Sequence, residues 1–222
     1  MKERSGPRDG KMKDGITLGD DGNFFISGTS PIRKERGILY TPENIQLILD
    51  DLKRQTRRII RPQPDSQGAI LQMREMVEQP GTWVYNGQTF TCLYGTTGDR
   101  LYVKEGLKRK GGGIFYRRDD VMVPELDGPK VWRWQRNTLS PRHMPKDCAR
   151  LWLEITNVRI ERVQDISQHD AAEEGCGDDL IVPPRCRIRY EAIWSGIHGY
   201  TGEDSWAANP YVWAISFRRI KS

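Results

Sequence analysis

Apolar residues recur with a helical period in one clear segment, which follows Thr41. Four aliphatic side chains there have the i, i+3, i+4, i+7 spacing of a helix with one buried face. Thr41 is a suitable N-cap residue, and Pro42 suits the first helical position because no N–H is needed there. The pattern predicts a one-sided helix from Pro42 until the periodicity fails after Gln55. The four aliphatic positions are Ile45, Ile48, Leu49 and Leu52.

Alternation of apolar and polar residues predicts strands further along the chain. Residues 101–105 have the pattern of a short strand, and residues 211–220 that of a longer one with aromatic residues on one face. Residues 151–160 alternate twice, which fits either one long bent strand or a hairpin that turns near Asn157. A further hairpin is expected around residues 114–118.

Two more short helices are expected between these strands. Ser167 and Asp170 have the spacing of a capping box, and Gly175 is a natural helix stop. Residues 185–197 form a second amphipathic stretch. The predicted strands outnumber the helices and lack regular crossover helices, which argues against a doubly wound parallel sheet. The fold class is therefore α+β, and the best fit is a PUA-like mixed β-barrel with flanking short helices and long loop insertions.

The length of 222 residues fits one domain with insertions. Residues 61–98 and 106–149 lack clear patterns, so we expect them to be insertions in a domain that spans residues 37–222. Residues 1–36 are rich in charge and glycine and poor in large apolar groups, so burial cannot offset their ordering entropy. They are expected to form a flexible basic arm.

Charge and composition narrow the class of partner only slightly. The net charge of +5 mildly favours an anionic partner such as nucleic acid. No pair among the four cysteines has the spacing of a structural zinc site, and the three histidines are at unrelated positions, so no metal or other cofactor is expected. No apolar run matches a signal peptide or a membrane span. The sequence predicts a cytoplasmic protein with no membrane partner.

One short segment carries a recognisable motif. The letters DLKRQTRR, residues 51–58, resemble the G-x-K-x-x-T/E-x-R signature of ASCH domains, a branch of the PUA-like barrels. Lys53, Thr56 and Arg58 stand at signature positions, whereas Asp51 stands where the family has glycine. The segments GDRLYVKE, RHMP, VQDISQHDAAEEG and SWAANPYVWAISFRRI are similar to a phage or prophage subfamily of these domains, which implies a bacterial host cell.

The resemblance covers about residues 37–220 and implies a barrel whose mouth binds a nucleobase or nucleotide. Some small members of the family remove the acetyl group from N4-acetylcytidine with a lysine, a threonine and a glutamate. By motif, Lys53 and Thr56 correspond to the first two. Alignment through ISQHDAAEEG makes Glu174 the glutamate, with its neighbour Glu173 as the alternative. Insertions of the size found here are absent from those small amidohydrolases.

The same residues suit amide hydrolysis on chemical grounds. Thr56 becomes a nucleophile only when a base takes its proton, and Lys53 can be that base once it is neutral. Glu174 could protonate the departing amine, and Arg58 or a backbone N–H could hold an oxyanion. Arg57 would contact the ligand beside them. The alternative is a solvated helix end, where basic side chains oppose the negative pole of the helix and have no chemical role.

Three more residues are candidate ligand contacts. Arg133 and Trp134 belong to a segment that interleaves aromatic and cationic residues, a mixture that can hold unpaired bases. The alternative is that these aromatic side chains anchor a long loop to the core. Glu105 follows an apolar strand, so it either lines the mouth of the barrel or is an ordinary strand-end charge.

Two classes of function are compatible with these features. The first is a nucleobase-binding protein that recognises a modified nucleoside, a nucleotide, RNA or modified DNA, with or without hydrolysis of an N4-acylated cytidine. The second is a phage accessory or assembly protein that uses the barrel as a protein-interaction scaffold and binds no nucleotide. We take the first as the working hypothesis.

Overall fold

The structure is a computed structural model in which the chain divides into two compact units, Met1–Arg33 and Lys34–Ser222. In the first unit, β1 (Ile16–Leu18) pairs antiparallel with β2 (Phe24–Ile26). The remainder of the predicted arm up to residue 32 lies outside the described residues. The structure describes residues 16–18, 24–26, 33–64, 74–76, 81–85, 87–124, 132–177 and 185–220.

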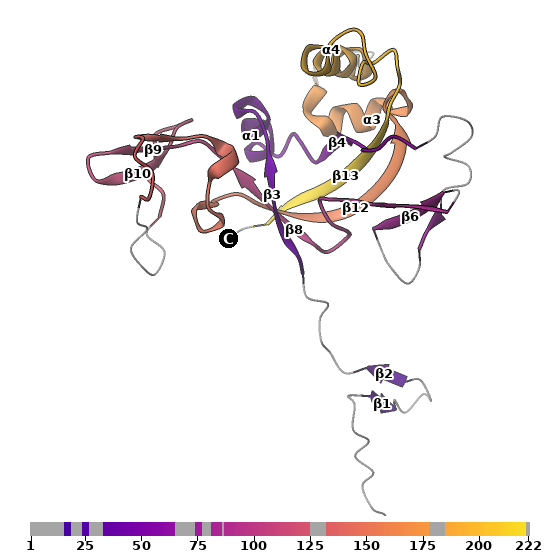
Figure 1. Ribbon diagram of the computed structural model, residues 1–222, viewed down its shortest axis with the longest axis horizontal. Coiled ribbons are helices and arrows are strands. Elements are labelled where there is room, and N and C mark those ends of the chain that lie inside the picture. The colour runs from indigo at the N-terminus through magenta and orange to yellow at the C-terminus, as the bar shows by residue number, and fades with distance from the viewer. Residues whose placement is uncertain are drawn as a thin grey trace, which may run out of the picture. The chain divides into compact units, whose positions relative to one another are not determined.

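A five-stranded sheet forms the centre of the second unit (Figure 1). Its order is β3-β8-β12-β13-β4, in which β3 and β8 are parallel and the other neighbours are antiparallel. The α+β class is confirmed. Among the described residues no ladder joins the edge strands β3 and β4, so a closed barrel is not observed. The strands are β3 (Glu35–Leu39), β8 (Arg100–Lys104), β12 (Trp152–Arg162), β13 (Tyr211–Ile220) and β4 (Gln55–Ile59).

Two smaller sheets occupy the regions expected to be loop insertions. The first has the order β5-β6-β7 and the second β10-β9-β11. The hairpin expected at residues 114–118 is present, but it begins earlier. Strands of two to four residues are too short to show alternation, which is why the sequence concealed them. They are β5 (Arg74–Glu75), β6 (Thr82–Tyr85), β7 (Gln88–Thr91), β9 (Leu107–Lys110), β10 (Gly113–Tyr116) and β11 (Thr138–Leu139).

The predicted first helix is α1 (Pro42–Leu49), and its N-cap is confirmed because the Asn44 N–H donates to Thr41 Oγ1. The prediction that it continues to Gln55 was wrong. Asp51 has φ +60°, and the Leu52 N–H donates to the Leu47 carbonyl at 2.8 Å, as in a Schellman C-cap. This left-handed residue ends the helix. Asp51 stands where the ASCH signature has glycine, and it adopts a backbone conformation that glycine adopts without steric cost.

The later elements follow the predicted order. β12 is one strand with a bulge between Ile155 and Asn157, so the hairpin alternative was wrong. Ser167 caps α3 (Gln168–Ala171), since its Oγ accepts from the Asp170 N–H at 3.0 Å. A π-helical turn η4 (Ala172–Cys176) follows, and Gly175 within it has φ +93°. The last helix is α4 (Cys186–His198), and short 3-10 turns are η1 (Pro141–His143), η2 (Lys146–Cys148) and η3 (Val163–Asp165).

β13 lies between two apolar layers. Trp213, Ile215 and Phe217 belong to the main core, whereas Val212 packs with α4 residues such as Tyr190 in a second cluster. Figure 1 shows α3 and α4 close together and α1 apart from them. Because α4 covers part of β13 on the face of Val212, and α1 and the small β5-β6-β7 sheet contribute to the core on the face of Trp213, the strand is buried in its first half and becomes exposed at Arg218 and Arg219.

Candidate functional site

The turn after α1 places Lys53 two residues before β4. The Arg54 N–H donates to the Glu173 carbonyl at 2.7 Å, and the Phe217 N–H donates to the Arg54 carbonyl at 2.8 Å, so η4 and β13 fix this backbone. Lys53 is only 4% exposed, and its Nζ lies 2.5 Å from Glu174 Oε2 and 2.7 Å from the Glu174 carbonyl oxygen. Two predicted site residues that are 121 positions apart therefore form a buried ion pair.

Arg57 holds the second oxygen of the same carboxylate. Its Nη1 donates to Glu174 Oε1 at 3.1 Å, and its Nη2 lies 2.6 Å from Glu161 Oε1 and 3.4 Å from Asp170 Oδ2. Arg159 contacts Glu161 at 2.8 Å and Asp170 at 2.6 Å. Three cations therefore face three carboxylates, and their formal charges cancel. We call this set the charged cluster: Lys53, Arg57, Arg159, Glu161, Asp170 and Glu174.

The cluster shifts the pKa of its members. Burial tends to lower the pKa of Arg57, but the charges of Glu174 and Glu161 outweigh it and raise this pKa. Burial tends to raise the pKa of Asp170, but a hydrogen bond from Gln55 and the charges of Arg159 and Arg57 outweigh it and lower this pKa. Both groups are therefore charged at neutral pH.

The lowered pKa of Asp170 predicts a loss of stability in acid. A carboxyl group with a lower pKa when folded contributes stability above its unfolded pKa, here 3.8, and loses it as the pH falls further. We expect the urea midpoint to fall as the pH drops below about 4, with a shallower fall in Asp170→Asn than in the parent protein. Parallel midpoint curves for the two proteins would refute this assignment.

Thr56 and Arg58 lie on the other face of β4 from Arg57, because side chains alternate along a strand. Thr56 is 3% exposed and lies near Tyr40. Arg58 Nη2 donates to the Leu39 carbonyl at 2.8 Å, and its guanidinium lies 5.2 Å from the centre of the Tyr40 ring. Arg58 thus bridges the two edges of the sheet, β3 and β4.

Two buried polar atoms at this place lack a hydrogen bond of ordinary geometry to a described residue, Tyr40 Oη and Arg58 Nε. Tyr40 Oη still lies close enough to the Thr56 side chain to interact with it. Arg58 also has no carboxylate within ion-pair distance in the described part of the chain. Burial raises the pKa of Tyr40 despite the opposing charge of Arg58, so the phenol remains a neutral donor. Buried groups without partners are uncommon, which makes these two atoms candidates for ligand contacts.

Tyr40 also lines a cavity of about 270 Å³. Glu105 lines the same cavity and is 2% exposed. Its two carboxylate oxygens accept from Arg150 at 2.8 and 2.7 Å, however, so its charge is already matched. Lys53 and Glu174 do not line this cavity, and Tyr40 lies between it and Thr56. The remaining lining residues are Pro42, Ile45, Gly106, Arg117, Arg118 and Pro141.

Arg133 and Trp134 are not brought to the charged cluster. Trp134 packs edge to face with Trp132, with ring centres 5.2 Å apart, and both side chains pack against the third core cluster around Leu107 and Tyr116. Arg133 is exposed. The packing of Trp134 matches the alternative in which aromatic side chains anchor a long loop to the core. Contact of Arg133 and Trp134 with a ligand stays a prediction.

Glu173 and Glu174 are neighbours in the same π-helical turn but have different surroundings. The Glu174 side chain enters the cluster, whereas Glu173 is half-buried and contributes its backbone carbonyl to the Arg54 N–H. Sequence reasoning missed Tyr40, Glu161 and Asp170 as members of the site. The only signal for Tyr40 was its position directly before the N-cap of α1.

Comparison with known proteins gave matches in structure alone. No family model matches the chain, and no curated protein matches it. The crystal structure of an ASCH domain from Lactobacillus crispatus matches with 13% identity and a TM-score of 0.36, covering 85% of this chain and 81% of that one. The crystal structure of protein EF3133 from Enterococcus faecalis, of the DUF984 family, matches with 8% identity and a TM-score of 0.38, covering 86% and 82%.

Other features of the chain bear on membranes, disulfides and metals. Within the described ranges, no helix has the length and apolarity needed to cross a membrane. All four cysteines are buried, and none forms a disulfide. The described residues contain no group of three or more His, Cys, Asp or Glu side chains placed to hold a metal ion.

Proposed function

We propose that the protein binds a modified nucleobase beside β4 and hydrolyses the amide of an N4-acylated cytidine. The observation that carries the proposal is the buried contact of 2.5 Å between Lys53 Nζ and Glu174 Oε2. Thr56, three positions after Lys53, is also buried. A lysine, a carboxylate and a hydroxyl that meet at one substrate would supply the base, acid and nucleophile that amide cleavage needs. The resemblance of residues 51–58 to the ASCH signature assigns Lys53 and Thr56, and the alignment through ISQHDAAEEG assigns Glu174.

One proton shift within the ion pair gives both the base and the acid that the reaction needs. Transfer of a proton from Lys53 Nζ to Glu174 Oε2 yields a neutral amine and a carboxylic acid. Thr56 Oγ1 then bonds to the acyl carbon while its proton passes to Lys53. Next, the bond from the acyl carbon to N4 breaks while Glu174 gives its proton to N4, which releases cytidine. The pair returns to its charged form.

Water completes the reaction. Its oxygen bonds to the acyl carbon of the Thr56 ester, the ester bond breaks, and a proton returns to Thr56 Oγ1 as the carboxylic acid leaves. Arg58 carries a charge with no carboxylate partner among the described residues, so it suits the stabilisation of the oxyanion. Tyr40 Oη is a second neutral donor on the same side of β4.

A binding module without turnover is the second candidate. It is favoured by the hydrogen bonds that already occupy the pair: Lys53 Nζ donates twice to Glu174, and Arg57 donates to the other carboxylate oxygen. The proton shift would replace these charge-assisted hydrogen bonds by neutral ones, which are weaker. Such a module would bind RNA or modified DNA with an affinity that falls as salt rises.

Incubation with N4-acetylcytidine and a panel of other modified nucleosides, followed by mass spectrometry, separates these candidates. We expect deacetylation of N4-acetylcytidine, with a fall of at least about 100-fold in Lys53→Ala because the general base is lost. Lys146→Ala is the matched control, since this lysine pairs with Glu35 at the surface. Binding of a nucleoside without any product would instead support the binding module.

A further inference from the structure

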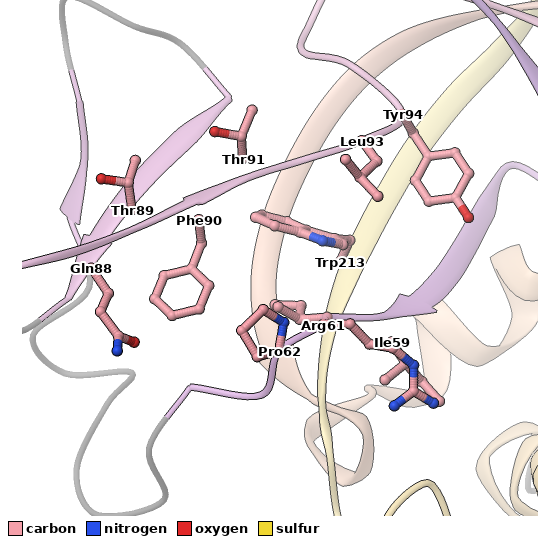
Figure 2. A pocket seen from close by; sticks show the side chains of 11 residues that line it. Ile59, Arg61, Pro62, Gln88, Thr89, Phe90, Thr91, Leu93, Tyr94 and Trp213 are labelled. Carbon is pink, nitrogen blue, oxygen red and sulfur yellow. The ribbon is translucent and has the colours of Figure 1, made fainter.

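A second cavity of about 430 Å³ lies between the end of β4 and the β5-β6-β7 sheet (Figure 2). This volume is within the range of sites that hold small molecules, about 300–1,000 Å³. The β7 strand that forms one wall is an edge strand, so part of its backbone has no strand partner among the described residues. The lining residues are Ile59, Ile60, Arg61, Pro62, Gln88, Thr89, Phe90, Thr91, Leu93, Tyr94 and Trp213.

Three aromatic side chains give this cavity flat apolar walls. In Figure 2 the Trp213 indole lies between Phe90 and Tyr94. Trp213 packs against Trp83, which does not line the cavity, with ring centres 4.9 Å apart. This packing positions the Trp213 indole before any ligand enters. The Trp213 indole N–H has no acceptor in the described part of the chain and is available to a polar atom of a ligand. Rigid aromatic faces with a few polar groups are what a planar base requires.

The charges around the cavity favour an anion. Its lining contains one charged residue, Arg61, and no carboxylate. Arg61 pairs with Asp204 and remains largely exposed. The Arg58 guanidinium lies 6.0 Å from the Tyr94 ring and 5.2 Å from the Tyr40 ring, so it stands between this cavity and the Thr56 side. Its buried Nε is free to donate to an oxygen placed there.

Strand register connects the cavity to the proposed catalytic site. Trp213 pairs directly with Arg58, and Ile215 pairs with Thr56, in the ladder between β13 and β4. Directly paired residues project on the same face of a sheet, and residues two apart on one strand are about 7 Å apart. The aromatic cavity and the Thr56 hydroxyl therefore lie side by side along one face, with Arg58 between them.

We propose that this cavity binds the base of a nucleotide next to the acylated cytidine, with Arg58 donating to the phosphate that links the two. The substrate class is then a single-stranded oligonucleotide and not a free nucleoside. This inference rests on the proposed function for the position of the cytidine. The aromatic walls bind the neighbouring base by stacking, which tolerates different bases because each has a π-face.

The test measures Kd by calorimetry with Lys53→Ala, so that the ligand is not consumed. The probe is a trinucleotide with N4-acetylcytidine in the centre and adenosine on both sides. Its control has abasic sugars at both flanks and keeps every phosphate. We expect the intact trinucleotide to bind about five- to a hundred-fold more tightly, the range for one base stacked on an aromatic side chain. Equal affinity for the two ligands would overturn the inference.

Further variants connect that difference to this cavity. Tyr94→Ala, added to Lys53→Ala, is expected to remove most of the difference in affinity between the two ligands. Tyr200→Ala is the control, because this aromatic residue is 80% exposed and does not line the cavity, and the difference should persist in it. Leu93→Asp changes a side chain that is 78% exposed, so the fold tolerates it, and its carboxylate should weaken binding. A difference that persists in both cavity variants would show that the neighbouring base binds elsewhere.

The proposed function and this inference can fail separately. Hydrolysis of the free nucleoside by the parent protein, with equal affinity for the two trinucleotides, would sustain the hydrolase and remove the second cavity from its site. Suppose instead that the intact trinucleotide binds more tightly through Tyr94 but the parent protein hydrolyses neither the nucleoside nor the trinucleotide. This result would support the cavity as a base-binding site and refute the reaction.

Discussion

Glu174→Ala is expected to lower the free energy of unfolding by about 3–5 kcal/mol, because it leaves the buried Lys53 without its counter-charge. Glu174 is 6% exposed and binds both Lys53 and Arg57. Without it, Lys53 has no carboxylate within ion-pair distance among the described residues. Urea denaturation at neutral pH, followed by circular dichroism, measures the change.

Glu173→Ala is the matched control for this change. The two glutamates are adjacent in the same π-helical turn, but Glu173 is half-buried and outside the charged cluster. A loss below about 1 kcal/mol is expected for it, as for an exposed ion pair. Equal losses in the two variants would show that the turn itself, and not the Glu174 carboxylate, supports the fold.

Thr56→Ala is expected to reduce the rate of N4-acetylcytidine hydrolysis by about 10⁴-fold or more, the scale for removal of an activated nucleophile. Thr56→Ser keeps the hydroxyl and should retain most of the activity. Because Thr56 is buried and both replacements are smaller, stability must be measured beside the rate. Steady-state kinetics at saturating substrate give the comparison.

The serine variant is the internal control. It removes the same methyl group from the core as alanine does, so a rate lost equally in both variants would assign Thr56 a packing role. A rate that survives in Thr56→Ala would mean that water attacks the amide directly, with Lys53 as its base.

The first helix shows how far local patterns determine the fold. Its N-cap and buried face followed from Thr41, Ile45 and Ile48, and all three are found as expected. Its end did not follow, because the apolar period continues to Leu52 while Asp51 adopts a left-handed conformation. Nothing in composition reveals that conformation, since aspartate takes it far less often than glycine.

The candidate site was only partly visible in the sequence. The ASCH-like motif pointed to Lys53 and Thr56, and the structure brings Glu174 to Lys53. Tyr40 and Glu161 were missed because they enter through tertiary packing. Tyr40 ends a strand in the sequence, and its relation to Thr56 exists only once β3 and β4 become the two edges of one curved sheet.

The sequence pointed to one aromatic residue as a ligand contact and did not indicate another that lines a cavity. Trp134 stood in the segment with the more suggestive sequence, yet it packs against Trp132. Trp213 was expected only to pack the last strand. It does so, and it also lines the larger cavity, because the short β6 and β7 strands lie opposite it. Those strands had no detectable period, so their contribution could not be inferred.

The most direct test is a crystal structure of Lys53→Ala with N4-acetylcytidine bound. We expect the acetyl carbonyl carbon within about 3–3.5 Å of Thr56 Oγ1, as in a near-attack geometry, with N4 facing Glu174 and the carbonyl oxygen facing Arg58 or Tyr40. A nucleoside bound elsewhere, with Thr56 and Glu174 still closed against their present neighbours, would contradict the proposed site.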